Sequence, residues 1–284
     1  MIYHYTSCDA LMNMISLKHK SKEIVIWATN VYEMEDRLEM QYGYEFVRSF
    51  LNSYEKGKKL PEIKRLSDIM PDIHEILIDT DNQDDFFQPK ERTPFVISFT
   101  DSCNNQRMWE EYADKHRGVC MAFDENELQR IARKGDETFI LSIIYNEENE
   151  QTENLLTSFA KYIVDSIKPY YDVAPYFVHD SYRNKIKTEI LQYLCPLVAA
   201  FIKERDYRWE SEVRWLNIVD TNSPSVNRVQ INGKARTYVN VTFPISFLKQ
   251  VYLGRDCQMT SEDRQALYSL NGIKTIYQHN YKQL

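Results

Sequence analysis

Short runs of alternating or continuous apolar residues recur along the chain, and this pattern predicts β-strands. Four such runs lie in the first half: Ile2–Tyr5, EIVIWATN at 23–30, TPFVISFTDS at 93–102 and VCMAFD at 119–124. Three more lie near the other end: RTYVNVTFP at 236–244, KQVYLG at 249–254 and IKTIYQ at 273–278. Strands near both ends predict one shared sheet.

Helical spacing appears between these runs. Thr6 and Asp9 match a capping box before an amphipathic stretch, and Thr260 with Asp263 opens a second helix near the end. CNNQRMWEEYADKHRG, residues 103–118, predicts a helix that starts at asparagine caps and stops at glycine. Four of its residues, spaced i, i+3, i+4 and i+7, share one face that we expect to be core: Trp109, Tyr112, Ala113 and His116.

Two long segments interrupt the strand pattern. Residues 55–92 are rich in Lys, Asp and Pro, which is typical of a surface insertion. Residues 152–206 carry apolar positions at helical spacing broken by prolines, which predicts a helical insertion. We therefore expect a single α+β domain over residues 1–284, with a central mixed or antiparallel sheet and helical insertions.

Composition narrows the class of protein. The chain has 284 residues, 43% hydrophobic and 13% aromatic, which is a folded composition. A net charge of -7 disfavours a nonspecific grip on nucleic acid or on an anionic membrane, and no apolar run approaches a membrane span. The five cysteines are scattered without a CxxC pair, which favours reduced thiols over a disulfide framework or a metal site. A cytoplasmic protein is expected.

The stretch DYRWESEVRWLN, residues 206–217, holds the strongest candidate chemistry. Interpreted as a strand, it points Glu210, Glu212 and Arg214 to one face and both tryptophans, Trp209 and Trp215, to the other. Paired carboxylates can stabilise an oxocarbenium-like centre and activate a nucleophile in sugar-transfer chemistry. An equally weighted interpretation is a surface strand whose acids pair with Arg214 or Lys203.

Two other polar groups could complete a site. His4 lies in the first strand, where one ring nitrogen could hold a ribose hydroxyl while a backbone group fixes the other, and Thr6 beside it forms a polar pocket edge. Ser98 and Thr100 present hydroxyls on one face of their strand and could orient a neighbouring carboxylate. A structural histidine and ordinary turn hydroxyls are the simpler alternatives.

Several motifs together resemble a bacterial family, the domain of unknown function DUF2971. They are YHYTS at the start, ISF, MWEEYADKHRGVCMAF, and a late lysine followed by WESEVR and VYLG. The resemblance spans nearly the whole chain in order and spacing. The family name carries no activity.

A more distant resemblance is to the ADP-ribosyltransferase fold, in which groups on a first strand, a hydroxyl strand and a late acidic strand surround NAD. It implies that His4 contacts the nicotinamide-side ribose, that Ser98 and Thr100 take the hydroxyl positions, and that Glu212 is catalytic with Glu210 beside it. The sequence departs from that pattern, because SFT replaces the usual STS.

The same resemblance implies a role for NAD as co-substrate and no metal. Tyr3, Tyr5 or Trp27 would stack on nicotinamide, and Arg214 would line the same site. The acceptor would be protein, nucleic acid or water, and the role that of a toxin or phage-defence effector.

Two other functions stay open. One is a nucleotide- or partner-binding module without catalysis. The other is a nuclease in which Asp36, Glu39, Glu210 and Glu212 gather a divalent metal ion.

Overall fold

A computed structural model describes residues 1–15, 22–34, 39–46, 91–135, 137–145, 195–231 and 233–277, together with Asn154, Thr157, Ser158 and Lys161. Most of the predicted surface insertion at 55–92 and of the helical insertion at 152–206 lies outside these residues, as does the C-terminal end of the chain. Within the described part, no helix is both long enough and apolar enough to cross a lipid bilayer.

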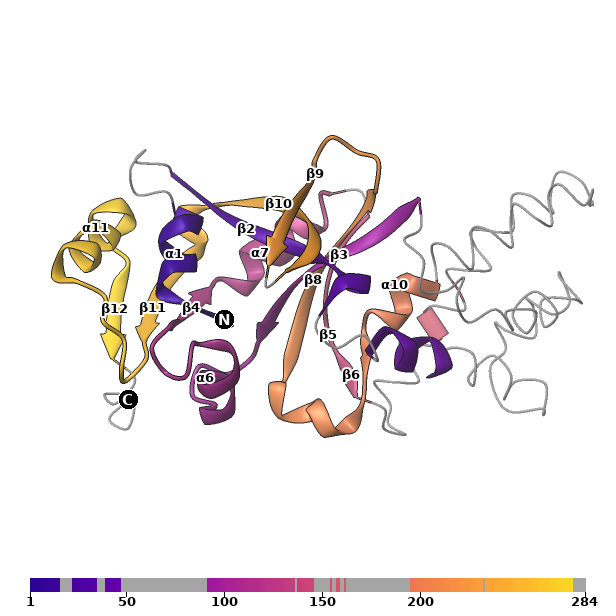
Figure 1. Ribbon diagram of the computed structural model, residues 1–284, viewed down its shortest axis with the longest axis horizontal. Helices are drawn as coiled ribbons and strands as arrows, with labels where there is room; N and C mark the ends of the chain where they lie inside the picture. The colour runs from indigo at the N-terminus through magenta and orange to yellow at the C-terminus, as the bar shows by residue number, and fades with distance from the viewer. Residues whose placement is uncertain are drawn as a thin grey trace, which may run out of the picture.

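The strands form a mixed α/β arrangement around one large sheet (Figure 1). In chain order they are β1 Ile2–Thr6, β2 Glu23–Asn30, β3 Arg92–Thr100, β4 Val119–Phe123, β5 Thr138–Ser142, β6 Ile144–Tyr145, β7 Ile202–Lys203, β8 Glu212–Asp220, β9 Val226–Ile231, β10 Lys234–Pro244, β11 Leu248–Leu253 and β12 Lys274–Tyr277. The helices are α1 Cys8–Ile15, α6 Gln106–Tyr112, α7 Glu125–Ala132, α10 Cys195–Ala199 and α11 Ser261–Asn271, with 3-10 turns η2 Val31–Glu33, η4 Arg205–Glu210 and η5 Ile245–Phe247.

The sheet runs β12-β11-β4-β1-β3-β2-β10-β9, and β8 pairs with β3 on one side and β5 on the other. The β11–β12 pair is parallel and every other pair in this sheet is antiparallel. The predicted mixed sheet is confirmed at this level. A separate parallel pair joins β6 to β7.

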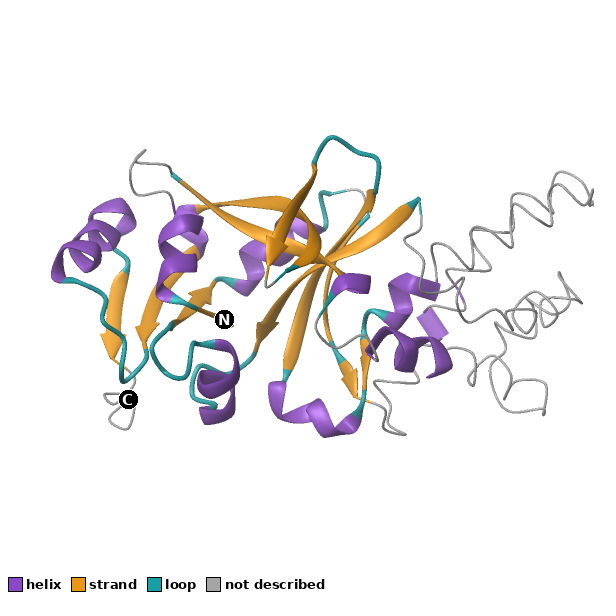
Figure 2. Ribbon diagram, in the orientation of Figure 1, coloured by secondary structure: helices purple, strands orange, loops and turns teal. Residues whose placement is uncertain are grey.

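The sheet forks at β3. One edge of this strand pairs with β8 along its whole length, whereas the other edge is shared by two strands. β1 pairs with it at Thr100, and β2 pairs with it at Phe95 and Val96. Beyond the fork, β2 and β10 run at a steep angle to β3 and β8 (Figure 2).

Two apolar cores form on the two faces of the sheet. The larger one takes buried side chains from α1, α7 and α11 together with Ile97, Phe99, Val213 and Trp215 of β3 and β8. The smaller one lies under α6, where Trp109 is fully buried against Tyr5 and Cys120. Alternation explains the division, because neighbouring residues of a strand point to opposite faces.

The local sequence explains where the helices begin. Asn105 caps α6, Asp124 caps α7 and Thr260 caps α11, each accepting hydrogen bonds from backbone N–H groups of the first turn. The cap at Thr260 through Asp263 is the one expected from the sequence. At the first helix the cap is Ser7, whose hydroxyl accepts from the Ala10 N–H, rather than Thr6.

The helix predicted over 103–118 is shorter than its apolar spacing suggests. It ends at Tyr112, and the next residues Asp114, Lys115 and His116 all have positive φ, between 46° and 68°. Three successive left-handed residues turn the chain sharply towards β4. Trp109 and His116 still meet, stacked with ring centroids 6.4 Å apart, although they no longer share a helix.

Candidate functional site

The three strands that carry the sequence motifs are neighbours in the sheet. Tyr3 of β1 lies opposite Thr100 of β3, and Thr100 lies opposite Glu212 of β8. Ser98 and Arg214 form the next pair along the same two strands. Directly opposed residues in an antiparallel pair share a face, so these five side chains lie on one side of the sheet.

On this face five charged side chains are buried together. Their relative exposures range from 0 to 6%. We call this set the buried charge cluster: Glu39, Lys203, Glu210, Glu212 and Arg214. The first belongs to the helical residues 39–46, the second to β7, the third to η4 and the last two to β8.

Lys203 lies at the centre of the cluster. Its Nζ is 2.5 Å from Glu210 Oε2, 3.2 Å from Glu212 Oε2 and 3.3 Å from Glu39 Oε2. Burial alone would lower the pKa of Lys203, but the carboxylates of Glu212 and Glu39 raise it well above its usual value. The amine therefore stays an ammonium ion that bridges three acids.

Arg214 is the second cation and has no exposed surface. It holds Glu212 through two bonds, Nε to Oε1 at 2.7 Å and Nη2 to Oε2 at 3.1 Å, and it also contacts Glu39. Its Nη1 donates to the Ala200 carbonyl at 2.6 Å. A planar guanidinium suits such a two-pronged grip, which a lysine could not reproduce.

These cations fix the charge of Glu212. Burial alone would raise the pKa of its carboxyl, but Arg214 and Lys203 outweigh that effect and lower the pKa to about 2. Glu212 is therefore an anion at neutral pH and cannot exchange a proton there. Its chemical capacity is electrostatic.

Hydroxyl groups surround the two glutamates. Tyr112 Oη donates to Glu210 Oε1 at 2.7 Å, and Tyr145 Oη accepts from the Glu212 N–H at 2.8 Å. Thr100 Oγ1 donates to the Glu210 carbonyl at 2.6 Å. The Ser98 hydroxyl bonds the Glu212 carboxylate and helps to lower its pKa. Ser98 thus meets the carboxylate of Glu212, whereas Thr100 bonds the main chain of Glu210 and not its carboxylate.

Glu210 joins the cluster from a 3-10 turn and not from the strand expected from the sequence. The strand interpretation of 206–217 is wrong for its first half, because Arg205–Glu210 forms the 3-10 turn η4 and Ser211 adopts a left-handed φ of 43°. The strand starts only at Glu212. The two tryptophans accordingly separate: Trp215 enters the larger core, while Trp209 packs at the smaller one.

His4 lies on the other face of the sheet. Its neighbours Tyr3 and Tyr5 point towards the side of Thr100, so the imidazole points away from it and meets the Phe99 ring edge-on, 5.8 Å between centroids. Its Nδ1 donates to the Ser98 carbonyl at 2.8 Å, at the fork where neither β1 nor β2 pairs with β3. Burial lowers the pKa of His4, so the ring stays neutral.

The remaining predicted residues lie around the site or apart from it. Tyr5 donates to the Ser102 carbonyl at 3.0 Å and packs on Trp109, and Thr6 ends β1. Trp27 lies on the β2–β10 branch, where it is 48% exposed and stacks on Tyr238 with centroids 4.0 Å apart. The structure brings Tyr3, Ser98, Thr100, Glu210, Glu212 and Arg214 around one site.

Sequence reasoning missed part of the cluster. Lys203 was predicted only as a surface partner of the acids, and it is 5% exposed. Tyr145 and Tyr112 carried no separate signal for a contact with Glu212 or Glu210, since each is distant along the chain. The sequence assigns Glu39 a role only under the nuclease alternative.

The nuclease alternative meets an electrostatic obstacle. Glu39, Glu210 and Glu212 do converge, but the ammonium of Lys203 already lies within 3.3 Å of all three. Asp36 is outside the described residues. Over the ranges the structure covers, no group of three or more His, Cys, Asp or Glu side chains has an arrangement that could hold a metal ion.

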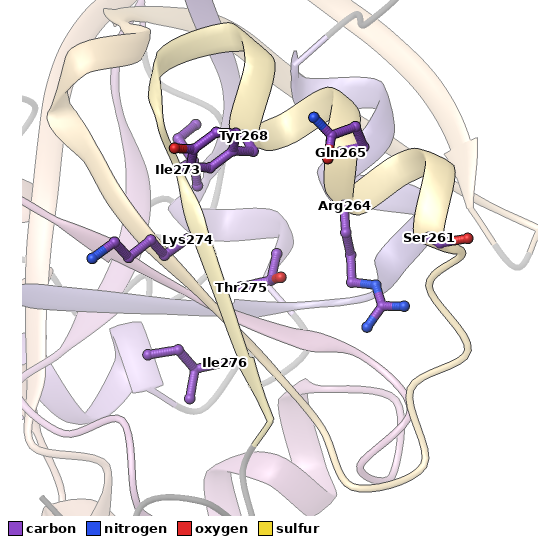
Figure 3. Close-up of a pocket in the computed structure, with 8 residues that line it drawn as sticks. All are labelled: Ser261, Arg264, Gln265, Tyr268, Ile273, Lys274, Thr275 and Ile276. Carbon is purple, nitrogen blue, oxygen red and sulfur yellow. The ribbon is translucent and has the colours of Figure 1, made fainter.

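An open pocket lies at the opposite end of the sheet from β8. Its volume is about 460 Å³, and it lies between α11 and β12 (Figure 3). Arg264 and Lys274 supply its charged groups. Since none of the predicted site residues lines it, the pocket and the buried charge cluster are separate features.

Comparison with known proteins gives one match. No curated protein and no solved structure matches this chain. Residues 108–215, which run from α6 to the middle of β8, match the family model described as "Protein of unknown function (DUF2971)". This segment contains Tyr112, Tyr145, Lys203 and both glutamates of β8 and η4, so the matched region supplies most of the cluster and supports the resemblance to DUF2971.

Proposed function

We propose that this protein binds NAD across β1, β3 and β8 and that the Glu210–Glu212 pair supports cleavage of the bond between nicotinamide and ribose. The observation that carries the proposal is the row Tyr3–Thr100–Glu212, which joins three motifs from distant parts of the chain. The ADP-ribosyltransferase pattern places a His or Arg of a first strand, a hydroxyl strand and an acidic strand around NAD. Tyr3, rather than His4, provides the first-strand group in this row.

Glu212 and Glu210 would have two different roles in this reaction. Glu212 stays anionic at neutral pH, so it would stabilise the positive charge that develops on the ribose as the bond loosens. Glu210 is as deeply buried as Glu212, but its carboxylate accepts a hydrogen bond from Tyr112, whose side chain is 47% exposed. Glu210 would therefore orient the incoming nucleophile. Protein, nucleic acid and water are the acceptor classes of this proposal, and a toxin or phage-defence role goes with it.

The ion pairs impose a condition on this chemistry. Both oxygens of Glu212 are engaged, Oε1 by Arg214 and Oε2 by Arg214 and Lys203. A ribose hydroxyl would have to displace one of these donors or share a lone pair with it. NAD binding should consequently loosen the contact between Arg214 and Glu212, which makes the two events thermodynamically linked.

A second candidate is a nucleotide- or partner-binding module without catalysis. The same engagement of Glu212 favours it, because a carboxylate that is 4% exposed and held by two cations is arranged as a structural anion. Under this alternative the cluster fixes the ends of β8 and β7, and the ligand contacts only the surrounding aromatic and hydroxyl groups.

One experiment separates the candidates. Purified protein is titrated with NAD by calorimetry and then assayed for nicotinamide release, alongside Glu212→Gln, Glu210→Gln and the matched control Glu204→Gln, whose side chain is exposed. The proposal predicts binding and turnover by the wild type, loss of turnover by at least about a hundredfold in Glu212→Gln, and wild-type behaviour of the control.

Saturable binding without turnover supports the binding module and overturns the transferase. No binding and no turnover by folded wild-type protein overturns the transferase and also overturns NAD as the ligand of a binding module. Circular dichroism of each variant checks that a lost activity is not a lost fold.

A further inference from the structure

Two cysteines that are far apart in the sequence meet at the rim of the larger core, where Cys257 is buried and Cys8 packs against it. Cys8 begins α1, and Cys257 lies in the loop between β11 and α11. Their sulfur atoms are 2.9 Å apart, as a hydrogen-bonded pair of free thiols. Cys8 is partly exposed and Cys257 is 9% exposed, so solvent reaches the pair from the Cys8 side.

Backbone hydrogen bonds around Cys8 and Cys257 fix the positions of the two thiols. Gly254 donates to the Gly118 carbonyl at 3.0 Å, and the Asp256 N–H donates to the His116 carbonyl at 3.1 Å. A side chain at Gly254 would lie 2.1 Å from the His116 oxygen, so only glycine permits this approach. Cys8 Sγ also lies 3.3 Å from the Arg117 carbonyl oxygen. Three segments are thus fixed around the two thiols.

We propose that Cys8 and Cys257 form an oxidisable dithiol that closes to a disulfide in the presence of a peroxide. The Cys257 thiolate attacks a peroxide oxygen, the O–O bond breaks, and the sulfur becomes a sulfenic acid as the first water or alcohol leaves. The Cys8 sulfur then attacks that sulfenic sulfur, the S–S bond forms and a water molecule leaves. Two thiols and one hydrogen peroxide thereby give one disulfide and two waters.

The surroundings of the two sulfur atoms determine which one attacks the peroxide and which one then forms the disulfide. The hydrogen bond from Cys8 lowers the pKa of Cys257 to about 7, helped by the Met259 N–H and by Arg264. The same bond raises the pKa of Cys8, and burial, Asp9 and Asp114 raise it further. Because the thiolate is the nucleophile, Cys257 attacks first and Cys8 resolves. Oxidation should therefore become faster as pH rises through about 7.

The other two described thiols provide the contrast. Burial raises the pKa of both Cys103 and Cys120, and both belong to the smaller core under α6. They should react with peroxide more slowly than Cys257 does. Cys103→Ser is thus a matched control for the removal of one thiol.

The test uses the full-length protein, reduced and freed of reductant, then treated with hydrogen peroxide. After alkylation and tryptic digestion, mass spectrometry should find the peptide at 1–18 joined to the peptide at 256–264. The link should be absent in Cys8→Ser and Cys257→Ser and retained in Cys103→Ser. Oxidation should raise the Tm by roughly 5–15 °C, because the bond closes nearly the whole chain into a loop.

The variants also separate attack from resolution. In Cys8→Ser, a sulfenic acid should accumulate at Cys257 and react with dimedone, whereas Cys257→Ser should give little dimedone adduct at Cys8. Thiols that stay reduced under excess peroxide, a disulfide that joins Cys103 to Cys120 instead, or a sulfinic acid at Cys257 in the wild type without any cross-link would each overturn the proposal.

Discussion

The two faces of the β3–β8 pair are built from alternate residues of the same strands, yet they hold together by different means. On one face Ile97, Phe99, Val213 and Trp215 join the larger apolar core. On the other, Ser98, Thr100, Glu212 and Arg214 meet charged groups and backbone carbonyls from four other segments. Hydrophobic packing is nondirectional, whereas each buried charge needs a specific partner at a specific atom. The polar face should therefore tolerate far less change.

The largest expected effect is the removal of the buried guanidinium. Arg214→Met leaves the carboxylates of Glu212 and Glu39 without their main partner, and should lower the free energy of unfolding by about 3–5 kcal/mol. Urea denaturation measures the loss. Arg228→Met is the matched control on exposed β9 and should change stability by no more than about 0.5 kcal/mol. Equal effects of the two variants would contradict the contrast between the faces.

Acid should weaken the polar face selectively. The pKa of Glu212 is lowered to about 2 in the folded protein from its usual 4.5. A depressed carboxyl pKa stabilises the fold above the unfolded value, and this contribution disappears as pH falls from about 4.5 towards about 2. Chemical denaturation at several pH values should show this decline in the wild type. In Glu212→Gln the free energy of unfolding should fall less steeply as pH falls. A slope equal to that of the wild type would contradict the assignment of this decline to Glu212.

A smaller effect is expected from one tyrosine hydroxyl. Tyr145→Phe removes the acceptor of the Glu212 N–H and should cost about 1–3 kcal/mol if no water replaces it. Tyr112→Phe is the companion variant, since its hydroxyl serves a carboxylate that Lys203 also holds. Because Tyr112 is half exposed, its loss should cost less than that of Tyr145. The reverse order, measured by thermal or urea unfolding, would argue against the hydroxyl assignments.

The smallest effect should come from trimming the apolar face. Ile97→Val removes one methylene from the larger core and should cost about 0.5–1.5 kcal/mol. The adjacent polar change Ser98→Ala, which removes a hydroxyl from Glu212, makes a direct comparison across the strand. If Ile97→Val proved as damaging as Arg214→Met, packing rather than charge pairing would dominate both faces.

Sequence patterns predicted the apolar face well. The strands at Ile2, Glu23, Arg92 and Val119 follow from alternation and β-branched runs, which depend on nearby residues only. The cap at Thr260 is equally local. Local rules explain these elements because burial of one face is enough to set a strand.

The same rules failed where backbone conformation was unusual. The left-handed residues Asp114–His116 cut short the helix predicted over 103–118, and the left-handed Ser211 splits the strand predicted over 206–217. No glycine marks either place, so the signal that usually announces a positive φ is absent.

The site was predicted in part. The acidic pair and the hydroxyls of Ser98 and Thr100 were found, because their residue types and alternation are visible in the sequence. Lys203 was paired with the acids but assigned to the surface, and no pattern indicated Tyr145. Burial and partner choice across distant segments depend on the tertiary fold, which neither spacing nor composition encodes.

The two edges of β3 acquire their partner strands at different times while the chain is being synthesised. Once this strand leaves the ribosome, its partners β1 and β2 are already present, and His4 can cap the carbonyl of Ser98 at once. Its other edge must wait until β8 emerges, more than a hundred residues later, which at ordinary translation rates is on the order of ten seconds. During that interval the nascent protein carries a central strand with one unpaired edge, so chaperone holding at this stage would protect it from aggregation.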